Sequence, residues 1–479
     1  MAAKDATHKR RRPGLLTKHW RQAKTDLDTA NAKLEQRVRE SRRTVSGPGP
    51  GESCLAFGQW VGAPEEKATR RGQHGIYGTA AGIEILASGE GTDGENDIIS
   101  QAWTYLGWKL GPGRERKRQF YIVLRQAMVL RAIGALDWAI KNWAEPPAIE
   151  LERLHKLSDA LLAELEIAKD GGDGDPVSLW IDWPSGDDAD TSVLGYRFAS
   201  KSPDAPRLAT TWAFHQAAVL NAITVCFRCG LAPGPDRYLV GRHVKTLVQW
   251  CNHILGAGDP DPVAVRVALF AGWSVLGLDH EQRPDRRDHM GKMFEAVPAS
   301  QRQKLQQGLE RAVHRTLREE ALQTDLHLPF LYRLPEAARD GVEDDIEEEE
   351  YRQEHLVVPT VPILLSLVAR LKGPLRFDQR YLDLLQTVTI SLTTSTPPVV
   401  PAQPTAANGT VNLAYLRSAL GEVEKSLDDI AAESVGWRLV KRVRWRRVVP
   451  NFFQRWYREI VGALLALTAT IAAKALGLL

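Results

Sequence analysis

The sequence is poor in cysteine, in alternating β-branched residues and in apolar residues near its amino terminus. Four cysteines among 479 residues do not make a disulfide framework, so a reduced cytosol is the simplest setting. The first residues, MAAKDATHKRRRPG, carry basic charge without an apolar core behind it, which excludes a secretory signal. The only strand-like piece is VSLWIDW at 177–183, so the sequence predicts an all-α fold.

Motifs that hold phosphate groups are also missing. There is no glycine-rich loop of the Gly-x-x-x-x-Gly-Lys type and no Asp-Asp-x-x-Asp motif that would bind a diphosphate through magnesium. The run DDAD at 187–190 differs from the Asp-x-Asp-Asp of proton-initiated terpene cyclases and stands in a loop-like stretch of Gly, Ser and Asp. An enzyme acting on prenyl chains is therefore the weakest of the hypotheses.

Charge is distributed unevenly along the chain. The net charge of +3 combines two basic stretches, 1–45 and 437–458, with an acidic run, DGVEDDIEEEEYRQE, at 340–354. A basic terminus can bind nucleic acid, but without a recognised nucleic-acid-binding fold we do not expect that partner. An anionic lipid surface or the acidic run itself would suit the basic residues equally well.

The last twenty residues form a long apolar run. The sequence IVGALLALTATIAAKALGLL at 460–479 contains one charge, Lys474, near its far end. As a helix it would extend about 30 Å, the thickness of a hydrocarbon core. Arginine and aromatic residues precede it at 437–459, as is typical of a cytoplasmic interface. We expect a transmembrane tail anchor in the cell membrane, with membrane lipids as partners, a single carboxy-terminal pass and most of the chain cytoplasmic. A helix buried in a soluble domain is the alternative.

Two segments show the three- and four-residue spacing of a packed helical seam. The first comprises Trp20, Ala23, Leu27, Ala30 and Leu34. The second comprises Leu413, Leu416, Leu420, Val423, Leu427 and Ile430. We expect the first to pack on its own domain and the second to form a stalk, with packing against the body as the alternative. Small residues recurring on one face at 462–477 allow close approach in lipid, so we expect a homo-oligomer through residues 413–430 and 462–477.

These features divide the chain into eight segments. They are a basic tail (1–13), an amphipathic helix (14–44), a linker (45–53), a helical body (54–394), a proline-rich linker (395–411), a coiled-coil-like helix (412–436), a basic-aromatic segment (437–459) and a transmembrane helix (460–479). Apolar runs rich in small residues, such as TAAGIEILA and QAAVLNAIT, predict closely packed inner helices in the body.

The stretch RRGQHGIYGTAAGIEILAS at 70–88 places glycines, His74 and Tyr77 before an apolar helix. This entrance resembles that of an inner helix in the α/α-toroid superfamily, which includes terpenoid cyclases, protein prenyltransferases and lanthionine cyclases. The local likeness is to the lanthionine cyclases, whose helices open with a His-Gly-x-x-Gly turn. The resemblance implies an α/α-toroid or solenoid-like body with His74 and Tyr77 as candidate catalytic residues. A structural turn, in which Gly75 and Gly78 allow close helix contact, is the simpler interpretation.

The lanthionine cyclases also hold zinc through two cysteines and a histidine. Cys226 and Cys229 in CFRCG, with Cys251 in WCNHILG, resemble that set and would be the metal ligands here. Cys226 and Cys229 share a helix face, but Cys251 and His253 would point about 200° apart on a helix. Because cysteine in an apolar helix is often a small buried hydrophobe, we expect no cofactor, with zinc as the alternative.

The layout favours a tail-anchored, cytoplasm-facing helical sensor or scaffold rather than an enzyme. Such a layout suits a bacterial defence or stress effector that acts through its membrane segment. The alternative is a membrane-attached, zinc-dependent enzyme of the lanthionine cyclase type that modifies a peptide. Polar groups converging with His74 would favour the enzyme, whereas a filled interior would favour the scaffold.

Overall fold

The computed structural model describes most of the chain before the apolar run. The described residues are 13–58, 60–61, 75–89, 91, 94–110, 122–166, 205–229, 231, 237–280, 297–318, 330–333, 355–371, 378–393 and 411–429. The chain divides into two compact units, 1–424 and 425–479. In the second unit only 425–429 are described, and they are helical.

The all-α prediction is confirmed, because helices make up most of the described residues. They are α1 (Pro13–Glu40), α3 (Ile76–Ala87), α4 (Glu95–Lys109), α5 (Ile122–Asn142), α6 (Leu151–Glu166), α7 (Ala205–Cys229), α8 (Arg237–Gly256), α9 (Pro262–His280), α11 (Ala299–Thr316), α13 (Thr360–Leu371) and α14 (Gln379–Thr393). A further helix covers 416–429.

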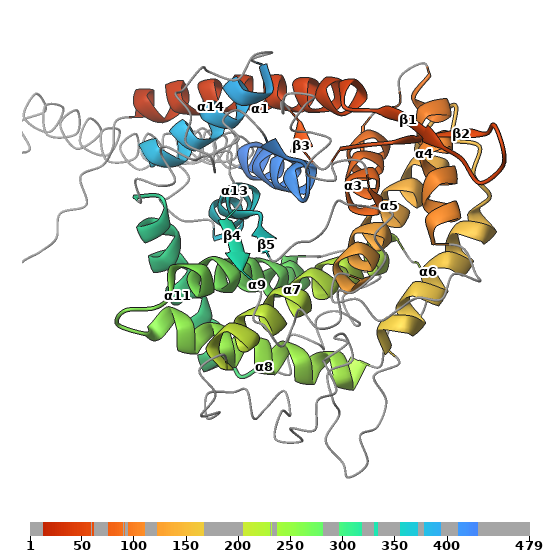
Figure 1. Ribbon diagram of the computed structural model, residues 1–479. Coiled ribbons are helices and arrows are strands. Elements are labelled where there is room, and N and C mark those ends of the chain that lie inside the picture. Colours follow the sequence, from red (N-terminus) through yellow and green to blue (C-terminus); the bar gives the residue numbers. More distant parts are fainter. Residues whose placement is uncertain are drawn as a thin grey trace, which may run out of the picture. The chain divides into compact units, whose positions relative to one another are not determined.

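In the first unit the helices form a closed series of neighbours. α3 packs on α5, α5 on α7, α7 on α9, α9 on α13, α13 on α14, α14 on α1, and α1 on α3. α4, α6, α8 and α11 pack against members of this series, α4 on α3, α6 on α5, and both α8 and α11 on α9. Figure 1 shows the series running from α3 in orange through α7 in green to α14 in blue.

Burial differs between α3, a member of the series, and α11, which packs on the series from outside. Every residue of α3 except Tyr77 is buried, as its run of Ala, Gly, Ile and Leu predicts. α11 instead buries one stripe and carries polar residues elsewhere, so it is amphipathic. The inner helices approach closely where glycine leaves room. A Cβ atom at Gly134 of α5 would lie 2.5 Å from Cγ1 of Val225 on α7.

Short antiparallel strand pairs accompany the helices. β1 (Arg43–Ser46) pairs with β2 (Ser53–Ala56), β3 (Trp60–Val61) with β6 (Val411–Asn412), and β4 (Phe330–Arg333) with β5 (His355–Val358). The predicted linker 45–53 is therefore part of a hairpin. Its glycines and prolines form the turn, which is closed by a 2.8 Å hydrogen bond from the N–H of Gly47 to the carbonyl of Glu52.

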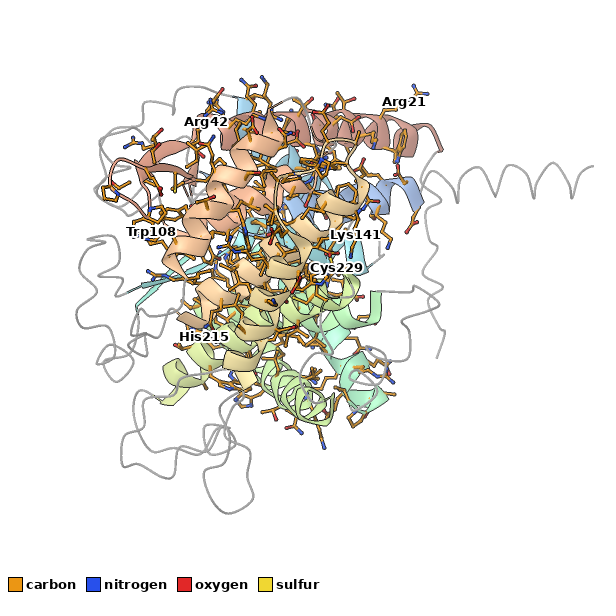
Figure 2. All side chains as sticks on the ribbon, turned by 90° about the vertical axis from the view of Figure 1, so that its right-hand side faces the viewer. Arg21, Arg42, Trp108, Lys141, His215 and Cys229 are labelled. Atoms are coloured by element: carbon orange, nitrogen blue, oxygen red, sulfur yellow. The ribbon has the colours of Figure 1, made fainter. Side chains whose placement is uncertain are left out.

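The seam of the first helix packs on its own unit. Ala23, Leu27, Ala30 and Leu34 are buried on α1, together with Val38. α14 covers α1, and the hydroxyl of Thr389 on α14 donates to the carbonyl of Asp26 at 3.0 Å. Figure 2 labels Arg21 and Arg42, which lie toward opposite ends of this helix.

Several predicted segments lie outside the described residues. They include residues 1–12 of the basic tail, the strand-like piece 177–183, the acidic run 340–354, most of the proline-rich linker and everything after 429. No helix among the described residues combines the length and apolar character that crossing a bilayer requires. The predicted transmembrane helix 460–479 is among the residues that are not described.

Candidate functional site

Residues 411–424, here called the docked segment, lie against helices that are distant in sequence (blue in Figure 1). The segment begins at β6, where Asn412 pairs with Trp60 of β3. Tyr415 follows with a φ of 63°, a left-handed value that is uncommon for residues other than glycine. The chain is helical from residue 416.

The apolar side of the docked segment is buried inside the first unit. The residues concerned are Leu413, Leu416, Leu420 and Val423. They are four of the six residues predicted to form a stalk seam, since Leu427 lies in the second unit and Ile430 outside the described residues. For these four the burial agrees with the alternative of packing against the helical body, and the homo-oligomer through 413–430 and 462–477 stays a prediction. A three- and four-residue spacing identifies a packed face but not the surface it packs on.

A first polar cluster joins α3, α5 and α7 to the docked segment. The guanidinium of Arg131 on α5 donates to both carboxylate oxygens of Glu84 on α3, with Nε to Oε2 at 3.1 Å. It also donates to Asn221 on α7 and to the hydroxyl of Ser418 in the docked segment. The Ser418 hydroxyl in turn donates to Glu84 at 3.2 Å. Each Arg131 nitrogen therefore has an acceptor although the residue is only 1% exposed.

Residues of this cluster stabilise the positive charge of Arg131. Burial lowers the pKa of Arg131, but the charge and hydrogen bond of Glu84, with smaller contributions from Tyr415 and Tyr77, together more than offset that effect, so the pKa of Arg131 is raised. The two charges remain paired in the interior. Ser418 completes the hydrogen bonds of the pair from the docked segment.

A second polar cluster joins α9 and α13 to the docked segment. The guanidinium of Arg370 on α13 donates hydrogen bonds to both carboxylate oxygens of Glu422, with Nε to Oε2 at 2.7 Å. The indole Nε1 of Trp273 on α9 donates to the same oxygens at 3.2 and 3.3 Å. Arg370 also donates to the Trp273 carbonyl, and its guanidinium carbon lies 5.0 Å from the ring centroid. A two-pronged guanidinium beside an indole N–H is a strong recognition site for a carboxylate.

Tyr415 links the two clusters. Its ring packs edge-on against Phe270, at 5.2 Å between centroids, and against Trp273 at 5.7 Å. The guanidinium carbon of Arg131 lies 4.9 Å from the Tyr415 ring centroid. Burial raises the pKa of the Tyr415 phenol to about 12, partly opposed by the charge of Arg131. Ser418 and Glu422 are four residues apart on the helix that begins at residue 416, so they present one helical face to the body, and Tyr415 directly precedes that helix.

Additional contacts hold the outer side of the docked segment. Arg417 donates to the side chain of Asn31 on α1 at 2.9 Å and to the carbonyl of Ser88 at 3.1 Å. Lys24 on α1 pairs with Glu424 at 3.1 Å. Both members of the Lys24 pair are partly exposed, so this pair contributes little to stability compared with the buried clusters.

Of the two predicted catalytic residues, the structure describes Tyr77 alone. His74 lies outside the described residues. Tyr77 lies in the first turn of α3, and its side chain is hydrogen-bonded to Tyr415. The glycine-rich entrance therefore places Tyr77 beside the docked segment. Its predicted catalytic role stays a prediction.

The three cysteines predicted as metal ligands face different neighbours. Cys226 Sγ donates to the carbonyl of Leu130 at 3.9 Å and Cys229 Sγ to that of Gly134 at 3.1 Å, both on α5. Cys251 Sγ on α8 donates to a carbonyl of α9 at 3.8 Å. Within the described residues no group of three or more His, Cys, Asp or Glu is placed to hold a metal ion. Figure 2 labels Cys229, the last residue of α7, and His215, which lies earlier on the same helix.

Burial makes two of these thiols poor thiolates. The pKa of Cys226 is raised from 9.0 to about 12 by burial, with nearby Cys229 adding to the rise. Burial also raises the pKa of Cys251. A zinc ligand must lose its proton, so these environments suit small buried side chains better than metal ligands.

The charged residues of both clusters were missed in the sequence. Three of the four charged residues stand alone in an apolar run, Glu84 in TAAGIEILA, Arg131 in VLRAIGAL and Arg370 in LLSLVARL, whereas Glu422 stands in the polar stretch GEVEKS. That isolation is a usable signal, because buried Arg and Glu are almost always paired. The identity of each partner is not readable from the sequence, since 47 residues separate Glu84 from Arg131 and 52 separate Arg370 from Glu422.

The arrangement is suited to binding and orienting a helical segment. No family model, curated protein or solved structure matches the chain. The docked segment and its two polar clusters therefore form the candidate functional site.

Proposed function

We propose that this protein is a membrane-attached helical sensor or scaffold whose body holds the docked segment and so controls the chain that follows it. The body would be of the α/α-toroid type. The closed series of helix neighbours supports that architecture, as does the docked segment, whose partners come from α1, α3, α5, α9 and α13.

The observation that carries the proposal is the pair of buried polar clusters on one helical face. A buried charge pair adds little net stability relative to apolar residues, yet removing one partner is strongly destabilising. Such pairs therefore favour one docked arrangement and penalise partial ones. This all-or-none character is what a segment with a docked and a released state requires.

In this proposal, the residues that follow the docked segment bind the membrane when the segment is released. The basic-aromatic residues 437–459 and the apolar run 460–479 suit a cytoplasmic membrane interface and a membrane anchor. Docking would restrain these residues, and release would extend their reach toward lipid. A bacterial defence or stress effector acting through its membrane segment would use such coupling. The zinc-dependent alternative gains no support, because Cys226 and Cys251 face different helices.

Flotation on lipid vesicles tests the proposal. The full chain should float with vesicles of phosphatidylcholine and anionic phosphatidylglycerol, and a variant lacking 460–479 should not. Glu422→Gln should float at a lower lipid concentration, because it weakens docking. Glu424→Gln is the matched control, since it changes the same charge at a partly exposed position. A full chain that stays with the protein fraction would contradict membrane attachment, and equal lipid requirements for wild type and Glu422→Gln would contradict coupling.

A further inference from the structure

The docked segment covers two arginines of the helical body. One of them has its counter-charge within the body, and the other has it in the docked segment. Arg131 has both oxygens of Glu84 and the amide oxygen of Asn221, all from the helical body. Ser418 adds to a cluster that already exists. For Arg370 the carboxylate partner within the described residues is Glu422, which the docked segment supplies. Undocking would therefore leave this cation without its counter-charge.

The surroundings of Arg370 are prepared for a carboxylate. Its side chain is 4% exposed in the docked state, and its guanidinium donates to the carbonyl of Trp273, a contact that Glu422 does not supply. Gly277 on α9 makes room for it, because a Cβ atom there would lie 3.0 Å from a guanidinium nitrogen. The indole N–H of Trp273 faces the same two oxygens. Fixed donors on two helices form a site that a carboxylate on another chain would also satisfy.

Aromatic side chains of α9 form a second contact surface for the docked segment, beside the site that binds the Glu422 carboxylate. Phe270 and Trp273 stack at 5.9 Å and receive the ring of Tyr415 edge-on. Tyr415 directly precedes the helix that begins at residue 416, and Glu422 lies within that helix, seven residues after Tyr415. The body therefore contacts an aromatic ring at the start of the helix and a carboxylate about two turns farther along.

We propose that this surface is a peptide-recognition site, occupied at rest by the chain's own docked segment, and that its activating ligand is a segment of a partner protein in which a tyrosine directly precedes a helix and a glutamate follows that tyrosine by seven residues. The docked segment is then an internal competitor for the site. The inference rests on the proposed function for its consequence, because displacement by the partner would release the membrane-directed residues. The binding site itself can be tested without lipid.

The test uses the full-length protein and labelled synthetic peptides of residues 411–429, VNLAYLRSALGEVEKSLDD. The wild-type peptide should bind the Glu422→Gln protein at least about tenfold more tightly than the wild-type protein, whose own segment competes at a high effective concentration. On the Glu422→Gln protein, a peptide carrying Glu422→Gln should bind about 10- to 100-fold more weakly than the wild-type peptide. A peptide carrying Glu424→Gln should bind like the wild-type peptide. Fluorescence anisotropy gives each affinity.

Because the decisive change is in the peptide, misfolding of a protein variant cannot imitate it. Equal binding of the Glu422→Gln and Glu424→Gln peptides would overturn the proposal, as would unchanged binding after Arg370→Met is added to the Glu422→Gln protein. Wild-type chains that dimerise without peptide, and lose the dimer in Glu422→Gln, would show that the partner is a second copy and overturn the assignment to another protein. Peptide binding without any effect of Glu422→Gln on flotation would sustain this site and remove the proposed membrane function.

Discussion

Arg131 carries a full charge in the interior of the helical body, where an unpaired cation would be strongly unfavourable. Its guanidinium makes four hydrogen bonds, to acceptors on α3, α7 and the docked segment. The favourable contribution of this cluster depends on its completeness. Changing one member should therefore cost more than its hydrogen bonds alone.

Arg131→Met is expected to lower the free energy of unfolding by about 3–5 kcal/mol, because the Glu84 carboxylate would remain buried without its counter-charge. Urea denaturation at pH 7 measures the change. Arg153→Met on the exposed side of α6 is the control and should change stability by less than about 0.5 kcal/mol. Similar losses in the two variants would show that the Arg131 cluster is not the source of the effect.

Cys226 should make stability fall at alkaline pH. Its folded pKa of about 12 exceeds the ordinary value of 9.0, so the unfolded chain loses this proton first. The stabilising contribution is therefore complete below about pH 9 and declines as the pH rises toward 12. The slope is up to about 1.4 kcal/mol per pH unit. Urea denaturation between pH 8 and 10.5 should give a shallower decline for Cys226→Ala than for wild type. Parallel declines would mean that the Cys226 thiol titrates normally.

At the scale of elements, close helix contacts depend on particular glycines. Gly134 lets α5 approach α7, and its missing Cβ would meet Val225 at 2.5 Å. Gly107 on α4 has no atom within 4 Å of the corresponding position. The same substitution should therefore have opposite effects at the two positions.

Gly134→Ala is expected to lower the free energy of unfolding by about 1–3 kcal/mol through overpacking. Gly107→Ala should raise it by up to about 1 kcal/mol, because alanine favours the helical conformation. Thermal and urea denaturation of both variants measure the difference. A stabilising effect of Gly134→Ala would show that α5 and α7 are farther apart than the structure places them.

The comparison of sequence and structure is also informative at this scale. The helical runs were predictable because their apolar spacing and their glycine and proline boundaries agree. The hairpin at 43–56 was missed, since GPGPG is equally typical of a linker and the strands are only four residues long. The face from Leu413 to Val423 was recognised as packed. Its partner was not recognised, because the spacing of a seam is the same on a stalk and on a helical body.

At the scale of the whole molecule, the central claim is that the body holds residues 411–424 through charge pairs made across long stretches of sequence. The sequence showed isolated charges within apolar runs but not which of them meet. Only the closed series of helices brings α3, α5, α9 and α13 to the same segment. The claim therefore predicts that two residues 52 positions apart, Arg370 and Glu422, act as one unit.

Hydrogen exchange of the backbone amides of residues 411–424, followed by mass spectrometry, tests this claim most directly. Four full-length proteins are compared, namely wild type, Arg370→Met, Glu422→Met and the double variant. Each single change leaves one buried charge unpaired, so both should speed exchange in the docked segment. The double change removes both charges, so its loss of protection should be clearly smaller than the sum of the two single losses. Protection that is unchanged in both single variants, or single effects that simply add in the double variant, would contradict a segment held by this pair.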